Sequence, residues 1–481
     1  MIQRDQSRGL RWASELTGES EHVLAQHLHD VRVGIRLDPR SSSSADARES
    51  LLLATNMLLR FCPVVTVFLP SADVGLAAAV VGLGEMILGD PASVRLVEAE
   101  PKRGEYDAMM NVSPVCEGPP SWLSINSTGW VARLGLDGPT EGATGVSANH
   151  IGALAASALG VGAVSMKLLG YRDVTDPVEL SLWNRSTRNA AASDFGPDLA
   201  ERRLSLDGML IGCGAVTNGW AYAARRIGIT GSLAAVDHQR FRIENNGPYI
   251  LGGIKRLHER KVDMIHDELA PGLTVTPFAE LFEFFRVRIE TGMLPPPESI
   301  IAGLDGIPSR HAVQRMWPHT LIDMGSGGTT AQVVTHRRGS GGICLLEALR
   351  DDDGLDPAEQ AARVTGLPAE RIRDHPTDPI TDSDVVNAPP QFRAGLAEAR
   401  DRGQLVCGRV TDHYLNDEEY SAGFAAAVPF VSALAGIIGA AETARMLLTD
   451  NLESMHLQFD FRSMKLRALQ MTSAADCECS V

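Results

Sequence analysis

Apolar runs and helical patterns alternate along the first part of the chain. Short runs rich in Val and Ile, typical of buried strands, occur at 31–37 (VRVGIRL) and 64–70 (VVTVFLP), and the helix-like ESLLLATNMLLRF at 49–61 separates them. This alternation predicts an α/β fold built from layers. An Ala/Gly-rich stretch at 148–170 predicts another helix, and the Asn, Ser, Asp, Gly and Pro of 184–200 predict a linker.

The alternation resumes at about residue 204 and is interrupted once. Residues 346–420 are polar and helix-rich with Pro and Asp punctuation, which predicts an insertion, and an apolar helix follows at 427–448. This helix resembles the one near 148–169, since both are rich in small residues and end in Met-x-Leu-Leu or Met-Leu-Leu. We infer two related α/β halves; the alternative is that both segments are simply close-packing Ala/Gly helices.

These patterns divide the chain into four predicted segments. They are a first half without a glycine-rich phosphate loop (1–195), the first part of a second half (196–345), a helix-rich insertion (346–424), and the closing helix and strand of the second half with a loose tail (425–481).

Composition narrows the class of protein. The 481 residues carry 44 basic and 60 acidic side chains, a net charge of -16 that disfavours nucleic acid and fits either a basic protein partner or solubility alone. The polar start is not typical of a secretory signal, and the apolar stretch 425–441 is too short and too interrupted to predict a membrane span. The seven scattered cysteines are typical of a reducing cytoplasm.

A possible nucleotide loop lies in GMLIGCGAVTNGWAYAARRIGITGSLAAVD. A strand runs into Gly212 and Gly214, a helix follows, and a second strand ends at Asp237, where an acid can bind ribose hydroxyls. Thr217 stands where the fingerprint has its third glycine, and Gly219 comes two residues later. A tight strand–helix turn without a ligand is therefore the alternative interpretation.

The residues that follow make the pattern more specific. Asn245 and Lys261 come after Asp237, and Asp305 follows a later apolar strand with Arg310 behind it. In this order the second half resembles the adenylating family of ubiquitin-activating enzymes and the ThiF and MoeB activators of sulfur-carrier proteins, over about 204–345 and 425–460.

The resemblance implies a Rossmann-like adenylation domain, a degenerate adenylation-like first half and a helical insertion that carries a cysteine. It implies the following roles: ATP binding by Gly212, Gly214, Asp237, Asn245 and Lys261, magnesium coordination by Asp305, and catalysis by Lys261 and Arg310. Attack of a carboxylate on the α-phosphate builds negative charge that a lysine, a magnesium ion and backbone N–H groups can stabilise. Taken singly, Lys261 also fits a solvated helix lysine and Asp305 a turn acid.

The chain departs from the family pattern at two further positions. Pro248 stands where the family has a phosphate-contacting Arg, and Gln239 replaces the family's second acid. Arg242, Lys255 and Arg256 are the candidate replacements for the missing Arg, and the sequence does not decide between them.

The cysteines raise the question of a thioester. Cys407, between the insertion and the last apolar helix, has Arg402, Arg409 and His413 nearby in sequence, and the family's inserted segment commonly carries the catalytic cysteine. Cys407 is therefore the first candidate, the alternative being an inert buried thiol. Cys344 lies where sulfur-carrier activators often have part of a zinc knuckle, but no zinc is expected because the partner cysteines are missing. Cys213, inside the glycine loop, is interpreted as structural, and Cys62 and Cys116 lie outside the resemblance. Cys477 and Cys479 fit either a reactive pair in the tail or a disordered tail.

The leading hypothesis is an ATP- and Mg-dependent activating enzyme in the cytoplasm. Its layout resembles that of the activating enzymes of bacterial ubiquitin-like conjugation operons, some of which serve antiphage defence. Its implied partners are a ubiquitin-like protein ending in glycine and a conjugating enzyme, with no nucleic acid or membrane. The first half would shape the site and lend an arginine. The alternatives are a sulfur-carrier adenylyltransferase, an NAD-dependent oxidoreductase and a catalytically decayed scaffold.

Overall fold

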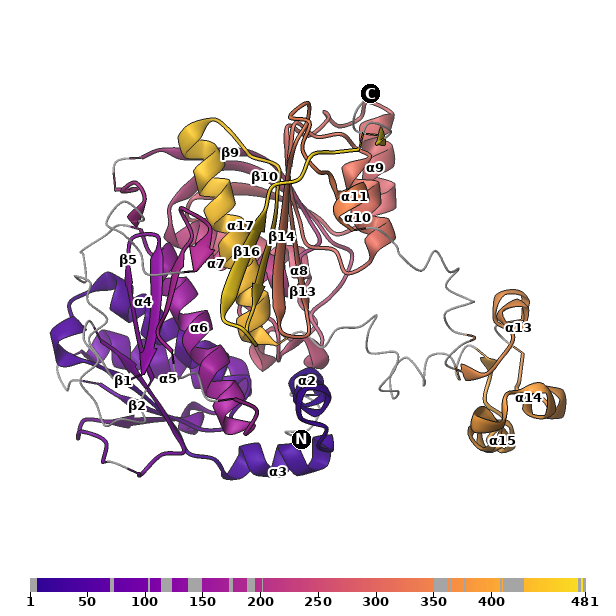
Figure 1. Ribbon diagram of the computed structural model, residues 1–481, viewed down its shortest axis with the longest axis horizontal. Helices are drawn as coiled ribbons and strands as arrows, with labels where there is room; N and C mark the ends of the chain where they lie inside the picture. The colour runs from indigo at the N-terminus through magenta and orange to yellow at the C-terminus, as the bar shows by residue number, and fades with distance from the viewer. Residues whose placement is uncertain are drawn as a thin grey trace. The chain divides into compact units, whose positions relative to one another are not determined.

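The computed structural model contains two eight-stranded sheets (Figure 1). The structure describes residues 7–69, 73–102, 104–113, 123–136, 149–172, 176–187, 195–200, 202–349, 362, 365–375, 378–406, 409, 428–474 and 477–478.

The first sheet has the strand order β3-β2-β1-β4-β5-β6-β7-β8. Its strands are β1 (Val33–Leu37), β2 (Val65–Phe68), β3 (Val94–Val97), β4 (Ala108–Val112), β5 (Leu123–Thr128), β6 (Val131–Leu136), β7 (Val178–Ser181) and β8 (Ser186–Thr187). The segment predicted as a linker at 184–200 thus contains a short strand, because 186–187 pair with β7.

The second sheet has the order β11-β10-β9-β12-β13-β14-β15-β16. Its strands are β9 (Leu204–Ile211), β10 (Ile229–Val236), β11 (Leu273–Phe278), β12 (Ser299–Ala302), β13 (Thr320–Gly327), β14 (Thr330–Arg337), β15 (Met455–Asp460) and β16 (Lys465–Leu469).

The two sheets share one topology. In each, the pairs from the first edge through the fifth strand are parallel and the remaining pairs antiparallel. The two Ala/Gly-rich helices are α6 (Ile151–Leu168) and α17 (Pro429–Thr449). Each lies at the equivalent point along the chain, in the connection from the sixth to the seventh strand of its sheet. The predicted α/β class is confirmed, and the shared topology supports the inference of two related halves.

The other helices connect the strands. Those of the larger unit are α2 (Ser7–Thr17), α3 (Glu21–Asp30), α4 (Ala45–Leu59), α5 (Val74–Leu88), α7 (Ala215–Arg226), α8 (Lys261–Leu269), α9 (Phe282–Glu290), α10 (Ile307–Gln314) and α11 (Leu345–Ala348), with 3-10 turns at Pro39–Ser41, Pro91–Ser93, Ile243–Asn245 and Ile254–Arg256. Helices α4 and α6 pack on the first sheet and α7 and α17 on the second, and α6 contacts α17 in between (Figure 1).

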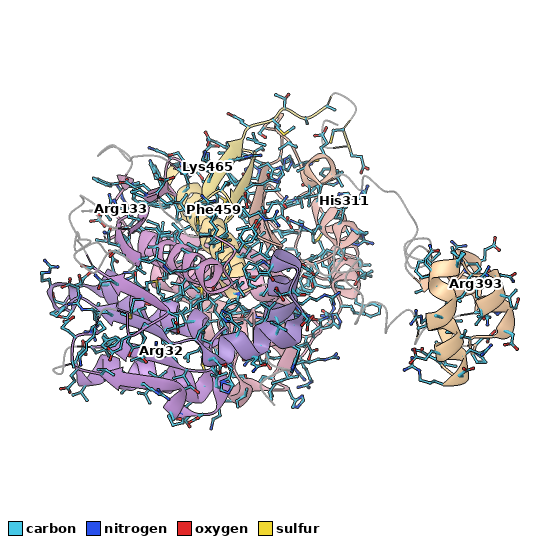
Figure 2. The ribbon with its side chains drawn as sticks, turned by 60° about the horizontal axis from the view of Figure 1, so that its bottom comes forward. Arg32, Arg133, His311, Arg393, Phe459 and Lys465 are labelled. Atoms are coloured by element: carbon cyan, nitrogen blue, oxygen red, sulfur yellow. The ribbon has the colours of Figure 1, made fainter. Side chains whose placement is uncertain are left out.

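Glycines let these central helices approach closely. On α6, a Cβ at Gly160 would lie 2.7 Å from Ile125 of the first sheet, and one at Gly162 would lie 2.5 Å from the Phe461 ring of the second half. On α17, a Cβ at Gly436 would lie 2.3 Å from the backbone nitrogen of Trp220 on α7. The interior beside them is aromatic and fully buried, as at Phe459 (Figure 2).

Both central helices are long and apolar enough to cross a membrane by length and composition, which the sequence analysis did not expect. Their apolar windows are 94% and 83% buried inside the molecule, respectively. They therefore pack as core helices of the described fold.

Residues Arg350–Ala425 form a second compact unit. Its described helices are α13 (Ala369–Asp374), α14 (Asp382–Asn387), a 3-10 turn at Pro390–Phe392 and α15 (Arg393–Asp401). They enclose a small core of Leu367, Ile380, Ala388, Leu396, Ala399 and Val406.

The close approach of α7 and α17 predicts the effect of one methyl group. Gly436→Ala should lower the free energy of unfolding by about 1–3 kcal/mol, because its Cβ would meet backbone and not a movable side chain. Gly82→Ala on α5 is the control: no heavy atom lies within 4 Å of its Cβ position, so we expect a gain of about 1 kcal/mol from helix propensity. Urea unfolding midpoints measure both; equal effects of the two variants would contradict the packing.

Candidate active site

A turn at Gly212 and Gly214 joins β9 to α7. Gly212 has a φ of 82°, and a Cβ there would lie 2.8 Å from the carbonyl oxygen of Gly303, so only glycine fits. Gly214 precedes α7, a helix of 12 residues whose N-terminus carries no side-chain hydrogen bond. The first amides of α7 are therefore available to an anion.

The shifted glycine pattern has a packing explanation. The buried Thr217 donates from Oγ1 to the Gly214 carbonyl oxygen at 3.0 Å. The close contact is made instead by Gly219, where a Cβ would lie 2.9 Å from the backbone of Ala433 on α17. Thr217 thus leaves the turn intact, and Gly219 serves the contact between α7 and α17.

Asp237 braces the glycine turn from the end of β10. Its Oδ2 accepts the Cys213 backbone N–H at 2.8 Å and its Oδ1 accepts that of Gln239 at 2.7 Å. The carboxylate is half-buried beside the turn, where ribose binding was predicted.

Lys261 opens α8 and is 4% exposed. Its Nζ donates to Gln239 Oε1 at 2.5 Å and lies 5.1 Å from the ring centre of Tyr249. Burial lowers the pKa of the Lys261 ammonium, while the charges of Asp237 and Asp305 act to raise it. Gln239, a departure from the family pattern, thus holds a lysine whose charge has no ion-pair partner in the described part of the chain.

Tyr249 is a site residue that the sequence analysis missed. Its hydroxyl oxygen lies 3.9 Å from the position of a Cβ on Gly214, and the side chain is buried. Burial raises the pKa of the phenol, and the charges of Asp305 and Asp237 raise it further. Tyr249 is therefore a neutral hydrogen-bond donor beside the turn, next to Pro248, where the family pattern has an arginine.

Arg8, on helix α2, is the second residue that was missed. Its positive charge acts on both Lys261 and Tyr249, which places it near the site. It forms no ion pair with any described residue. One turn later Trp12 anchors the helix, because its Nε1 donates to the Gly328 carbonyl oxygen at 3.0 Å. No sequence motif marks Arg8.

Asp305 and Asn245 have different surroundings. Asp305 is exposed in the loop after β12, and its charge acts on Lys261 and Tyr249. Asn245 is buried, and its Oδ1 accepts the Arg242 backbone N–H at 3.0 Å. Asn245 therefore shapes the loop that leads to Tyr249.

Arg310 lies in a buried ion pair. Its Nε donates to both oxygens of Asp323 on β13, at 3.1 and 2.9 Å, and its NH2 bonds to the same carboxylate. Burial raises the pKa of Asp323, and the adjacent guanidinium lowers it. The structure thus gives Arg310 a carboxylate partner, and its predicted catalytic role stays a prediction.

The three cations proposed to replace the missing arginine differ in their partners. Lys255 lies 3.3 Å from Glu85 of the first half, and Arg256 pairs with Glu259 and Asp267 at 2.6 and 2.5 Å. Arg242 is 74% exposed and lies 4.0 Å from Glu244. By contrast, the charge of Arg8 is one of the main influences that lower the pKa of Lys261.

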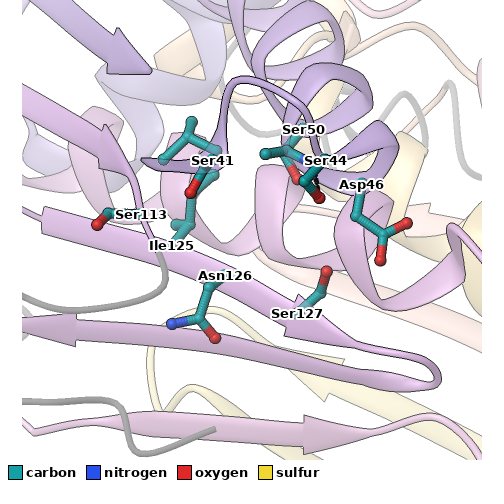
Figure 3. Close-up of a pocket in the computed structure, with 10 residues that line it drawn as sticks. Ser41, Ser44, Asp46, Ser50, Ser113, Ile125, Asn126 and Ser127 are labelled. Carbon is teal, nitrogen blue, oxygen red and sulfur yellow. Dashed lines mark hydrogen bonds between the residues drawn. The ribbon is translucent and has the colours of Figure 1, made fainter. Parts of the chain in front are cut away.

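The first half carries different residues at the same end of its sheet. Leu69 follows β2 as Asp237 follows β10, and the two make equivalent backbone bonds, to Val97 and Phe278, at 3.1 Å each. No glycine follows β1; Asp38 stands there, bonded to Arg40 and Ser113. A small pocket, half of whose lining residues are serines and which also includes Asp46 and Asn126, occupies this end of the sheet (Figure 3).

Two of the described cysteines lie close together in the fold. Cys407 lies outside the described residues. Cys344 and Cys477 approach each other to 3.5 Å between sulfur atoms, and with Glu347 they place three potential metal ligand atoms within 4.8 Å. The tail thus brings to Cys344 a thiol that sequence spacing did not reveal, although zinc sites usually have four ligands.

No family model matches the chain. It is 28% identical over 256 residues to the uncharacterized protein y4jF of Sinorhizobium fredii, a match that covers 49% of this chain and 46% of y4jF. The chain thus spans about half the length of that curated relative.

Solved structures of E. coli MccB are distantly similar to the chain. MccB alone is 12% identical with a TM-score of 0.38, over 75% of this chain and 95% of MccB. MccB with ATP is 11% identical with a TM-score of 0.35, over 74% of this chain and 97% of that one.

Burial predicts which thiols are inert. Burial raises the pKa of Cys62 to about 12 and that of Cys213 well above its usual value. Iodoacetamide at pH 8 should therefore leave both unmodified in the folded protein and alkylate both in urea. Peptide mass spectrometry measures this; modification of Cys213 in the folded protein at its rate in urea would contradict the buried turn.

Proposed function

We propose that the chain is an adenylating enzyme that uses ATP to activate the C-terminal carboxylate of a small ubiquitin-like protein. The observation that carries the proposal is the convergence on one sheet edge of an open helix N-terminus, a buried lysine and two aspartates. A dinucleotide oxidoreductase requires the glycine turn and Asp237 but has no use for Lys261 or Asp305.

The proposed first step exchanges one bond at phosphorus for another. A carboxylate oxygen attacks the α-phosphorus, the bond from that phosphorus to the bridging oxygen breaks, and pyrophosphate leaves with the bond's electron pair. The Lys261 ammonium, the amides at the start of α7 and the Tyr249 hydroxyl stabilise the charge on the phosphate oxygens. Asp237 binds the ribose.

Asp305 is the residue that would hold magnesium. Its exposed carboxylate fits a hard cation that takes one or two carboxylates and completes its shell with phosphate oxygens and water. Both oxygens of Asp237 accept backbone N–H groups, so that residue is less suited. When bound, the ion would neutralise charge on the phosphates.

Arg8 would take over the part of the arginine that Pro248 replaces. It comes from the half without a glycine turn, has no described ion-pair partner, and its charge acts on Lys261 and Tyr249. An unpaired guanidinium suits phosphate oxygens, which it can bind in bidentate fashion.

In the second proposed step the Cys407 thiolate attacks the acyl carbon of the adenylate, a thioester forms, and AMP leaves. The ubiquitin-like protein would then pass from Cys407 to a conjugating enzyme in the cytoplasm. Both enzymes would be encoded in an operon that serves antiphage defence. These finer assignments rest on the resemblance described from the sequence.

A sulfur-carrier adenylyltransferase is the second candidate. The cluster of Cys344, Glu347 and Cys477 favours it, because relatives of that kind often carry zinc cysteines at this place. The two candidates share the adenylation step and differ in the thioester.

Exchange of labelled pyrophosphate into ATP, with a ubiquitin-like protein as co-substrate, tests the first step. Lys261→Met should reduce exchange by about 10²–10³-fold through loss of transition-state charge stabilisation, whereas the exposed Lys255→Met should leave it unchanged. Burial lowers the pKa of Lys261, so its ammonium loses its proton at a lower pH than an ordinary lysine does. The KM for ATP should therefore begin to rise at that lower pH. Lys261→Arg should move that alkaline limb upward; full exchange by Lys261→Met would refute the assignment.

Cys407→Ala tests the second step. The variant should still catalyse pyrophosphate exchange. It should show no adduct with the ubiquitin-like protein on a non-reducing gel, whereas the wild type should show one that treatment with a thiol reagent releases. Cys62→Ala is the control and should keep the adduct. If Cys407→Ala retains the adduct, the acceptor lies elsewhere; if the wild type forms an adenylate and never an adduct, the sulfur-carrier candidate is favoured.

A further inference from the structure

Arg60 is a buried guanidinium at the end of α4, in the half without a glycine turn. It is 3% exposed, and none of the described carboxylates forms an ion pair with it. Burial lowers the pKa of the guanidinium to about 9 because the charged form loses its hydration. A buried cation is tolerated when its N–H groups find acceptors, so the partners of Arg60 indicate what it holds.

Those partners lie mainly on one loop of the other half. NH2 donates to the carbonyl oxygens of Ile250 and Gly252 at 3.1 and 2.7 Å, and NH1 donates to that of Asn246. Nε donates to Asn56 Oδ1 at 2.8 Å. Four hydrogen bonds thus leave Arg60, and three of them end on the backbone of 246–252.

Neighbouring residues extend the same contact. Asn56 Nδ2 donates to the Ile250 carbonyl oxygen at 3.0 Å, and Asn246 Nδ2 reaches back to that of Ile87 at 3.0 Å. A Cβ on Gly253 would lie 2.2 Å from the Met86 carbonyl oxygen, so the chain lies directly against α5. The loop is held by the first half along its length.

This loop carries Tyr249 into the candidate site. Tyr249 follows Asn245 in the chain, its backbone N–H donates to the Asn245 carbonyl oxygen at 3.2 Å, and its ring lies beside Lys261. Without Arg60 three carbonyl groups would lose a charged donor, and no hydrogen bond from a described residue of the second half reaches them.

We propose that Arg60 is a positioning residue through which the half without a glycine turn holds the loop 246–252, and with it Tyr249, in the geometry that binds ATP. The proposal rests on the proposed function. It gives the first half a specific task in nucleotide binding, in addition to its contribution to the core.

The experiment compares Arg60→Lys with Arg133→Lys in the full chain. Arg133 is an equally buried arginine of the first half, but its partners, Glu179 and Thr128, belong to the same half (Figure 2). Two readouts are used: hydrogen exchange of the amides of 246–252 by mass spectrometry, and the Kd of the ATP analogue AMPCPP with Mg²⁺.

Arg60→Lys should speed exchange of the loop amides and weaken AMPCPP binding by about tenfold, since one ammonium cannot reach all three carbonyl groups. Arg133→Lys should change neither, even with an equal loss of melting temperature. Asn56→Ala, which removes a single hydrogen bond to the loop, should act in the same direction as Arg60→Lys but to a smaller extent, and it tests the proposal if Arg60→Lys fails to fold.

The outcomes separate the two proposals. If the wild type binds no AMPCPP, the proposed function fails, whatever the loop does. If the wild type binds AMPCPP and the Arg60 and Asn56 variants bind it equally well with unchanged loop exchange, the positioning role of Arg60 is refuted. Equal weakening by Arg133→Lys would also overturn it.

Discussion

Contact between the backbones of α7 and α17 is the constraint on which the rest of the second half depends. Gly219 and Gly436 allow the two helices to approach until a methyl group on either would meet backbone atoms. That approach orients the N-terminus of α7, and hence the glycine turn, against the sheet. The same helix α17 contacts α6, so one closely packed layer supports both sheets. Small residues are required there because volume added beside rigid backbone has nowhere to go.

The two halves show how one topology supports different chemistry. Both sheets end in equivalent turns, but Asp38 and Leu69 stand in the first half where Gly212 and Asp237 stand in the second. A carboxylate at the start of the first turn disfavours a phosphate there, whereas open helix amides and Lys261 favour one in the second. The first half instead contributes contacts across the interface, through Arg60 and helix α2.

Sequence patterns were sufficient to predict the fold class, because the segments predicted as strand, helix and strand form β1, α4 and β2. They also selected Gly212, Asp237, Lys261 and Asp305 as candidates, and the structure brings these residues together at one edge of the sheet. They missed Tyr249, whose loop is held by residues of the first half, and Arg8, which lies more than 200 residues before the glycine turn. The sequence did not pair Cys344 with Cys477 for the same reason, since they lie 133 positions apart in the chain. The carboxylate partner of Arg310, Asp323, lies on another strand and has no local signature.

One nucleotide site is expected per chain, at the glycine turn of the second half and not at the corresponding turn of the first. Isothermal titration with AMPCPP and Mg²⁺ tests it most directly, because that analogue cannot be cleaved between its α- and β-phosphorus atoms. We expect the wild type to bind one nucleotide per chain. Gly212→Val should abolish binding, and Ser44→Ala, which alters the corresponding helix start of the first half, should retain it. No binding by the wild type, or binding that survives Gly212→Val and disappears in Ser44→Ala, would contradict it.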